Sequence, residues 1–218
     1  MTQAAVLSDP PAPKRGQGRP VSGTNDVGRE RLLVATEKLL QTLPPARVTI
    51  SRIAQEADVD PALVRYYFGN RAALLVAVVD RVTAHPRRNV QTDVKPAAAL
   101  SEHIAQTVQL VRRAPFLHRL INEELNDVGT EESRARVRSM NQDLVAYYRD
   151  LMKADEGREL VEVDPLFLYV AILGASDFFS LAEPIIRDLV PEGTDMHELT
   201  ERFKAFLSKL ILDGVRKR

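Results

Sequence analysis

Hydrophobic residues recur every three or four positions along most of the chain after residue 27, and this spacing predicts helices. The first stripe lies in residues 28–43 and stops at Pro44-Pro45, where a helix cannot continue. No segment has a convincing strand pattern. Later helices are predicted over residues 97–113, 115–127, 131–153, 164–190 and 195–216, with a kink at Pro184 after Glu183. The pattern therefore predicts an all-α fold.

A denser set of signals lies in residues 49–75. Thr49 is an N-cap type residue, and the apolar residues after it fall on one helical face. Residues 57–60 interrupt that face, Asp60 can cap a second short helix, and Pro61 suits its first position. A third helix follows and is expected to end near residue 85. Two short helices around a four-residue turn are typical of a helix-turn-helix, which presents one exposed helix to the major groove of DNA.

This stretch resembles the helix-turn-helix of the TetR family of bacterial transcriptional regulators. The matching residues are Thr49, Ile53, Ala54, Val59 and Asp60, then Leu63 to Phe68, Asn70-Arg71 and Ala73-Leu74-Leu75. Asp58 departs from the pattern, because the family usually has Gly at this position and a left-handed backbone is expected there. The resemblance implies an all-α fold with a three-helix N-terminal helix-turn-helix DNA-binding domain and a C-terminal helical domain for ligand binding and dimerisation.

We therefore expect three regions: a flexible basic arm (1–27), the DNA-binding domain (28–86) and the regulatory and dimerisation domain (87–218). Residues 1–90 hold 13 Lys/Arg against 8 Asp/Glu, whereas residues 91–218 hold 17 against 22, so the basic excess lies with the DNA-binding half. Within the arm, Gly18-Arg19-Pro20 resembles the core of an AT-hook, which inserts its arginine into a narrow minor groove. The alternative is a merely flexible, soluble tail.

The resemblance also implies which residues contact DNA. Arg65 is expected to grip guanine through its guanidinium, and Thr49 to aim its hydroxyl and its helix N-terminus at a phosphate. Of Tyr66 and Tyr67, one is expected to reach phosphate and the other to pack beneath its helix. The full expected set is Arg15, Arg19, Thr49, Ser51, Arg52, Pro61, Ala62, Leu63, Arg65, Tyr66, Tyr67, Asn70 and Arg71.

The last two predicted helices carry small and apolar residues that suit a helix–helix interface. In the resembling family these helices pair with their counterparts in a dimeric four-helix bundle. The expected dimer residues are Ala171, Gly174, Ala175, Phe203, Phe206, Leu207 and Leu210. The alternative is that both helices only pack within their own domain.

The resemblance further implies a small-molecule effector held between the helices of the second domain. The residues expected to line its pocket are Phe116, His118, Asn122, Tyr147, Tyr148, Asp177 and Phe178. Aromatic residues at helical spacing are more often plain core. Asp177 is either a pocket group or a hydrogen bond between dimer helices, and the sequence leaves both open.

Catalytic, metal-binding and cofactor-binding functions find no support in the sequence. The chain has no cysteine, and its four histidines are scattered without ligand spacing. There is no Gly-rich phosphate loop after a strand and no nucleophile elbow. The longest apolar run, residues 166–175, is far shorter than a membrane span. We therefore expect a cytoplasmic protein with no membrane partner, and not an enzyme.

The leading hypothesis is a homodimeric, sequence-specific regulator of transcription, acting as a repressor on a palindromic DNA operator and responding to a small-molecule effector. The alternative is an architectural minor-groove protein whose basic arm dominates binding and which responds to no ligand.

Overall fold

Capping and helix-breaking residues set the bounds of most elements. The computed structural model describes residues 24–84, 94–155, 160–161 and 163–216. The all-α prediction is confirmed, and within these residues strand-type pairing is limited to one isolated bridge between Leu160 and Arg216. The elements are α1 (Thr24–Thr42), the 3-10 turn η1 (Pro45–Arg47), α2 (Ile50–Ala57), α3 (Ala62–Phe68), α4 (Arg71–Thr83), α5 (Pro96–Arg113), α6 (Leu117–Arg119), the π-helix η2 (Leu120–Asp127), α7 (Glu131–Lys153), α8 (Pro165–Leu181), α9 (Glu183–Leu189) and α10 (Met196–Val215).

Three predicted helices differ from the observed ones. The first begins at Thr24, four residues before its predicted start and inside the expected arm. The helix predicted over 164–190 is split at Ala182 into α8 and α9, which are bent by 71°. Pro184 in the first turn of α9 explains the break, because proline cannot donate to the preceding turn; the break comes just before Glu183, not after it. The helix predicted over 115–127 is the short α6 followed by η2. The wider hydrogen bonding of a π-helix leaves no signature in apolar spacing.

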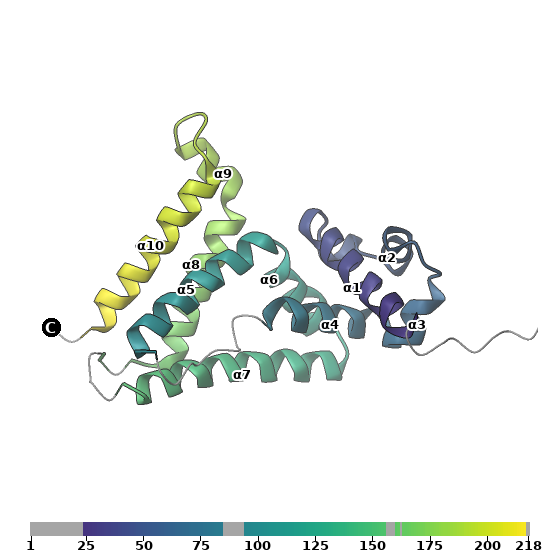
Figure 1. Cartoon of the computed structure of the whole chain (residues 1–218), viewed down its shortest axis with the longest axis horizontal. Helices are drawn as coiled ribbons and strands as arrows, with labels where there is room; N and C mark the ends of the chain where they lie inside the picture. The colour runs from purple at the N-terminus through teal and green to yellow at the C-terminus, as the bar shows by residue number, and fades with distance from the viewer. Residues whose placement is uncertain (1–23, 85–93, 156–159, 162, 217–218) are drawn as a thin grey trace, which may run out of the picture.

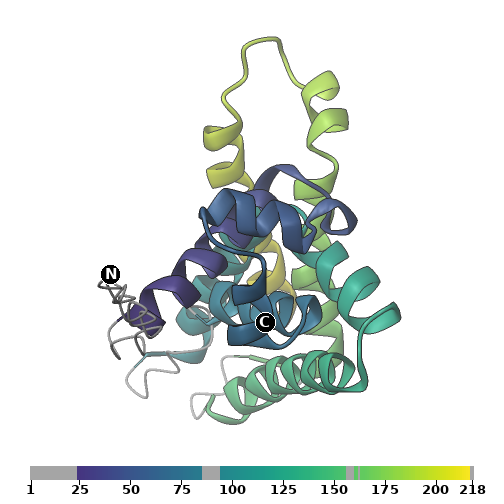
Figure 2. The same cartoon turned by 90° about the vertical axis from the view of Figure 1, so that its right-hand side faces the viewer.

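The helices form two groups that α7 connects (Figure 1). Helices α1 to α4 occupy one end of the molecule, α5, α8 and α10 occupy the other, and α7 runs beneath both. Seen from the side of α1–α4, the connection from α9 to α10 projects above the body (Figure 2). Among the described residues no single helix has both the length and the apolar composition to cross a membrane, and the bent pairs α3–α4 and α8–α9 pass that test only jointly.

The hydrophobic core around the helix-turn-helix extends beyond α1–α4. Leu32, Ile53, Val64 and Leu74 are fully buried in it, and together they fix the angles between the first four helices. The same core continues into α6, η2 and α7 through Leu117, Leu120, Leu125, Val137 and Met140. It therefore crosses residue 87, where the sequence suggested a division between domains.

A second core holds the C-terminal helices together. Leu100 and Ile104 of α5, Tyr148 of α7 and Ile172 of α8 are among its most buried members. Tyr148 packs edge-on against Tyr147 and His103, with ring centroids 5.5 and 5.3 Å away. Burial raises the pKa of the Tyr148 hydroxyl above its ordinary value.

The turn between α2 and α3 depends on a left-handed residue, as the sequence predicted. Asp58 ends α2 with φ 52° and ψ 55°, and among the described residues it is the one non-glycine residue with positive φ. Its backbone N–H bonds the carbonyl of Gln55, and the N–H of Val59 bonds that of Ala54. This closes the helix and turns the chain toward α3.

Arg71, the first residue of α4, joins the two groups of helices. Its Nε donates to the carbonyl of Val48 at 2.8 Å and its Nη2 to the carbonyl of Pro45 at 2.6 Å. Its Nη1 donates to Oε2 of Glu124 on η2 at 2.6 Å, and both side chains are largely covered. Farther along α4, Asp80 pairs with Arg136 of α7 at 2.7 Å. Helix α4 is thus tied to the C-terminal helices at two points.

Two substitutions of Asp58 are expected to differ in their effect on stability. Asp58→Ala should lower the free energy of unfolding by about 1 kcal/mol, because a Cβ without a local polar partner is strained in the left-handed region. Asp58→Gly should keep or raise it by up to about 1 kcal/mol, because glycine is free of that strain. Both variants lose the exposed Arg31–Asp58 ion pair at 3.6 Å, so the backbone effect is isolated by comparing them. Urea denaturation measures the difference, and equal stability of the two variants would contradict this account.

Removal of the Arg71 guanidinium is expected to weaken the fold itself. Arg71→Ala should lower the free energy of unfolding by about 2–3 kcal/mol, because two carbonyls and the Glu124 carboxylate lose their donors. Arg71→Lys should recover only part of this, since an ammonium cannot form the same fork. The matched control is Arg52→Ala, an exposed arginine on α2, which should stay within about 0.5 kcal/mol of the parent. Denaturation curves that show equal losses for Arg71→Ala and Arg52→Ala would refute the anchoring role.

Candidate nucleic-acid interface

Two capping residues fix the backbone of the helix-turn-helix. Oγ1 of Thr49 accepts the N–H of Arg52 at 3.4 Å and so caps α2. Oδ1 of Asp60 accepts the N–H of Ala62 at 2.7 Å at the start of α3. The Asp60 carboxylate is therefore directed at its own helix backbone, where it satisfies an end-of-helix donor.

Helix α3 divides into a buried face and an exposed face. Val64 is completely buried against the first core, and Leu63 is half-buried beside it. Pro61, Ala62, Arg65 and Tyr66 are exposed. A guanidinium flanked by small residues and one aromatic ring is well suited to lie against base edges. This face holds most of the residues that were expected to contact bases.

The two tyrosines of α3 lie in different environments. Tyr66 is 64% exposed, and its ring meets Tyr67 edge-on with centroids 4.9 Å apart. Tyr67 is half-buried against α1, and a Cβ on Gly28 would come within 2.8 Å of its hydroxyl oxygen. The small residue at position 28 therefore lets the Tyr67 ring approach α1. Tyr66 is the one left facing solvent.

The polar residues that flank α3 differ in whether their side chains already have partners within the protein. Ser51 and Arg52 are exposed on the first turn of α2, next to the Thr49 cap. Asn70 uses Oδ1 to accept the N–H of Ala73 at 2.8 Å, and so caps α4. Arg71 was predicted to contact phosphate, but its three guanidinium nitrogens are already bonded within the protein. The geometry therefore gives Arg71 an anchoring role, and its contact with phosphate stays a prediction.

One exposed cation near this surface was missed from the sequence. Arg47 ends η1 and lies exposed just before the Thr49 cap. In the sequence, the sign of this residue was a basic side chain two positions before the Thr49 N-cap. Arg15 and Arg19 of the expected basic arm lie outside the described residues.

The residues predicted to line an effector pocket fall into separate places. Phe116 lines a cleft between the two groups of helices. Nδ1 of His118 lies 3.6 Å from Oδ2 of Asp177, and Asn122 is 2.5 Å from Nε2 of the same ring. Burial raises the pKa of the Asp177 carboxyl, and the nearby His118 opposes that shift. The remaining members are Tyr147 and Tyr148, which belong to the second core, and Phe178, which is 70% exposed.

The predicted dimer residues also divide into exposed and covered sets. Ala171 and Gly174 of α8, with Phe206 and Leu210 of α10, are exposed on the outside of the molecule. Leu207 is only 3% exposed and packs in its own chain, so it is not available to a partner. The other two residues are Ala175, half-buried against the second core, and Phe203, stacked on Phe179 with centroids 4.0 Å apart.

Similarity to known families covers most of the chain. Residues 32–78 match the family model described as bacterial regulatory proteins, tetR family. Residues 93–217 match the model described as tetracyclin repressor-like, C-terminal domain. Among the described residues, no group of three or more His, Asp or Glu side chains is placed to hold a metal ion.

Individual relatives are more distant. The transcriptional regulator BetI of Rhizobium meliloti is 30% identical over 95 residues, which are 44% of this chain and 47% of that protein. An uncharacterized HTH-type regulator of Mycobacterium tuberculosis, Rv1255c, is 32% identical over 96 residues, 42% of this chain and 48% of that protein. The matched regions thus span about half the length of these curated relatives.

Solved structures share the fold over most of the chain. NalD of Pseudomonas aeruginosa, described as the secondary repressor of the MexAB-OprM multidrug efflux pump, aligns with a TM-score of 0.64 at 19% identity. The alignment covers 88% of this chain and 98% of NalD. A TetR family regulator of Marinobacter aquaeolei aligns with a TM-score of 0.63 at 18% identity, covering 91% and 100%.

The longer family match alone spans more than half of the chain, and the shorter one falls on the helix-turn-helix described above. TetR-type proteins are regulators of transcription and not enzymes. The protein therefore belongs to the tetR family of bacterial regulatory proteins, whose members are DNA-binding regulators of transcription.

Proposed function

We propose that the protein is a homodimeric repressor that binds a palindromic operator and releases it when a small molecule binds. The observation that carries the DNA-binding part is the exposed face of α3. Arg65 and Tyr66 project from a helix whose opposite face is fixed by the buried Val64. A rigid recognition helix with one strong base-reading side chain reads a short half-site, so two copies are needed for adequate specificity.

An apolar surface on α8 and α10 supports the homodimer. Large hydrophobic side chains are exposed on both helices, and large exposed apolar side chains on neighbouring elements are typical of an interaction surface. Its members are Phe167, Val170, Phe178 and Leu181 on α8, and Phe206 and Leu210 on α10. Two-fold pairing of this surface would bury it and produce a four-helix bundle.

Two glycines in these helices strengthen the argument. A Cβ on Gly174 or on Gly214 would meet no atom of its own chain within 4 Å. Glycine in a helix interior costs about 1 kcal/mol relative to alanine. Neither residue is required by packing within one chain, so the close approach of a second backbone accounts for them.

Replacement of Arg65 tests the recognition helix. Arg65→Ala should weaken binding to the cognate operator by about 1–3 kcal/mol and relax the preference at one base position. The operator is first obtained by selection from a random DNA pool, and affinities are measured by fluorescence anisotropy at fixed salt. The control is Arg138→Ala, an exposed arginine on α7, which should bind as the parent does.

Unchanged operator binding by Arg65→Ala would overturn this assignment. Uniform affinity of the parent for all sequences, with only a steep dependence on salt, would support the architectural alternative. A specific regulator should prefer its inverted repeat over random DNA by about three or more orders of magnitude.

Replacement of Gly174 tests the dimer surface. Gly174→Leu should raise the intrinsic helix propensity of α8 yet weaken self-association at least about tenfold, because the added side chain separates the two backbones. Sedimentation equilibrium measures the association, and circular dichroism confirms that the helices persist. The matched control is Ala135→Leu on the exposed side of α7, which should leave association unchanged. A Gly174→Leu protein that dimerises as tightly as the parent would place the interface elsewhere.

A further inference from the structure

A cleft of about 600 Å³ lies where the two groups of helices meet. Its walls come from α1 and α4 on one side and from the end of α5 and α6 on the other. This volume is within the range of pockets that enclose small organic molecules. The walls are largely apolar, with Leu40, Val78, Val82, Leu110, Phe116 and Leu117 among the lining residues.

The charged groups of the cleft are not equally available to a ligand. Arg81 lies 2.7 Å from Glu37 and 2.5 Å from Glu30, so its single charge is shared between two carboxylates and is not available to a ligand. Burial raises the pKa of the Glu37 carboxyl, while Arg81 opposes the shift. Glu37 is therefore engaged with Arg81, and a cationic ligand would have to displace that partner.

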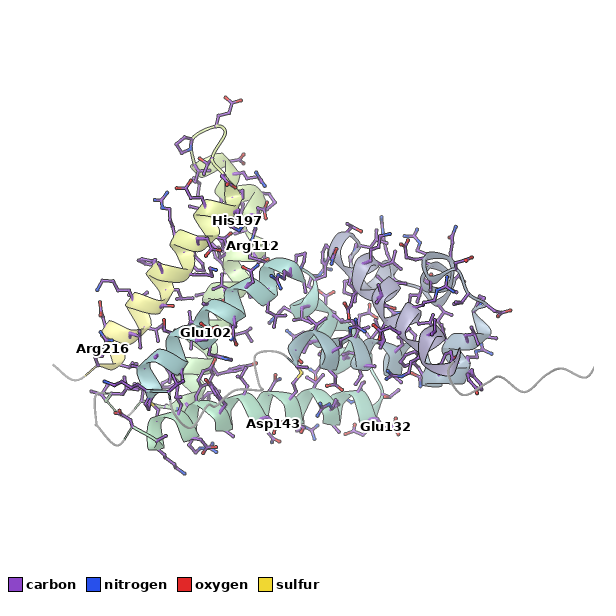
Figure 3. The ribbon with its side chains drawn as sticks, in the orientation of Figure 1. Glu102, Arg112, Glu132, Asp143, His197 and Arg216 are labelled. Atoms are coloured by element: carbon purple, nitrogen blue, oxygen red, sulfur yellow. The ribbon has the colours of Figure 1, made fainter. Side chains whose placement is uncertain are left out.

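Arg113 carries the charge of the cleft that is available to a ligand. It lies at the end of α5 on the cleft and makes no ion pair with the carboxylates that the structure describes. Its neighbour Arg112, labelled in Figure 3, is not among the lining residues and pairs instead with Glu183 at the start of α9. Gln109 lines the same wall and adds a carboxamide. A free guanidinium beside an apolar cavity matches a ligand with one anionic group.

Both walls of the cleft lead directly to the DNA-reading helices. Phe116 and Leu117 continue into η2, whose Glu124 holds Arg71. On the opposite wall, Val78 and Val82 belong to α4, the helix that Arg71 begins. A molecule wedged between these walls alters the spacing of α4 and η2. It can therefore favour one position of the recognition helix, provided that it binds that state more tightly.

We infer that this cleft is an effector site for an apolar organic anion, with the anionic group at Arg113 and the apolar body between α4 and α6. The binding part of the inference stands on the cleft alone. The effect on DNA rests on the proposed regulatory function.

The binding experiment uses two fluorescent probes with the same ring system. 8-Anilinonaphthalene-1-sulfonate is an apolar anion, and N-phenyl-1-naphthylamine lacks its charge. The full-length protein should bind one sulfonate probe per chain. Arg113→Gln should weaken this about fivefold to tenfold and leave the neutral probe nearly unchanged. Arg138→Gln, on exposed α7, is the charge control and should change neither affinity.

A second variant locates the site independently of charge. Gln109→Trp fills the cleft from its partly exposed wall and should abolish binding of both probes, with the helical circular dichroism signal retained. Binding of the sulfonate probe that is equal in Arg113→Gln and the parent would overturn the anionic class of ligand. Probe binding that survives in Gln109→Trp would overturn the site.

The regulatory part is tested with the selected operator. The sulfonate probe should shift the operator affinity of the parent at least about threefold, but not that of Gln109→Trp. Glu124→Gln should still bind the probe while losing most of the shift, because its link to Arg71 is weakened. If saturating sulfonate probe leaves the operator affinity of the parent unchanged, the regulatory role is overturned. If the parent binds no DNA selectively, the proposed function is refuted instead. The probe titrations would then still show whether the cleft binds an apolar anion.

Discussion

The guanidinium of Arg71 ties the helix-turn-helix to the C-terminal helices. Arg71 donates to the carbonyls of Pro45 and Val48, directly before α2, and to Glu124 of the π-helix η2. A planar arginine fork can serve these separate acceptors at once. The exposed pair of Asp80 and Arg136 adds a second contact between α4 and α7, so the position of α4 is coupled to η2 and α7. The orientation of α2 and α3 therefore follows the C-terminal helices.

Features set by neighbouring residues were predictable from the sequence. Thr49 and Asp60 accept backbone N–H groups within three residues, and the left-handed Asp58 was expected where the turn needed it. Arg71 was not predictable in the same way. Its acceptors lie 23, 26 and 53 residues away, and its charge alone is equally compatible with binding a phosphate. Periodicity also gave no sign of η2, because apolar spacing does not distinguish a π-helix from an α-helix.

In the candidate interfaces, too, the sequence did not indicate which single residues are exposed and which are covered by their own chain. The wide apolar stripe of α10 was visible in the sequence, but not which part of it the chain itself covers. Phe206 is 61% exposed, whereas its neighbour Leu207 is 3% exposed. Likewise, Phe116 and Phe178 were grouped as pocket walls, yet the first lines the junction cleft and the second faces solvent on α8. Tertiary packing decides these assignments, and it depends on contacts between distant segments.

The continuous first core has a consequence for how the chain can be divided. Leu117, Leu120 and Leu125 belong to the C-terminal part of the sequence, yet they complete the hydrophobic packing around α1–α4. A fragment cut after α4 would present that packing surface to water and lose the Glu124 partner of Arg71. The helix-turn-helix of this protein is therefore not a portable module, and grafting it onto another scaffold requires that α6 and η2 travel with it.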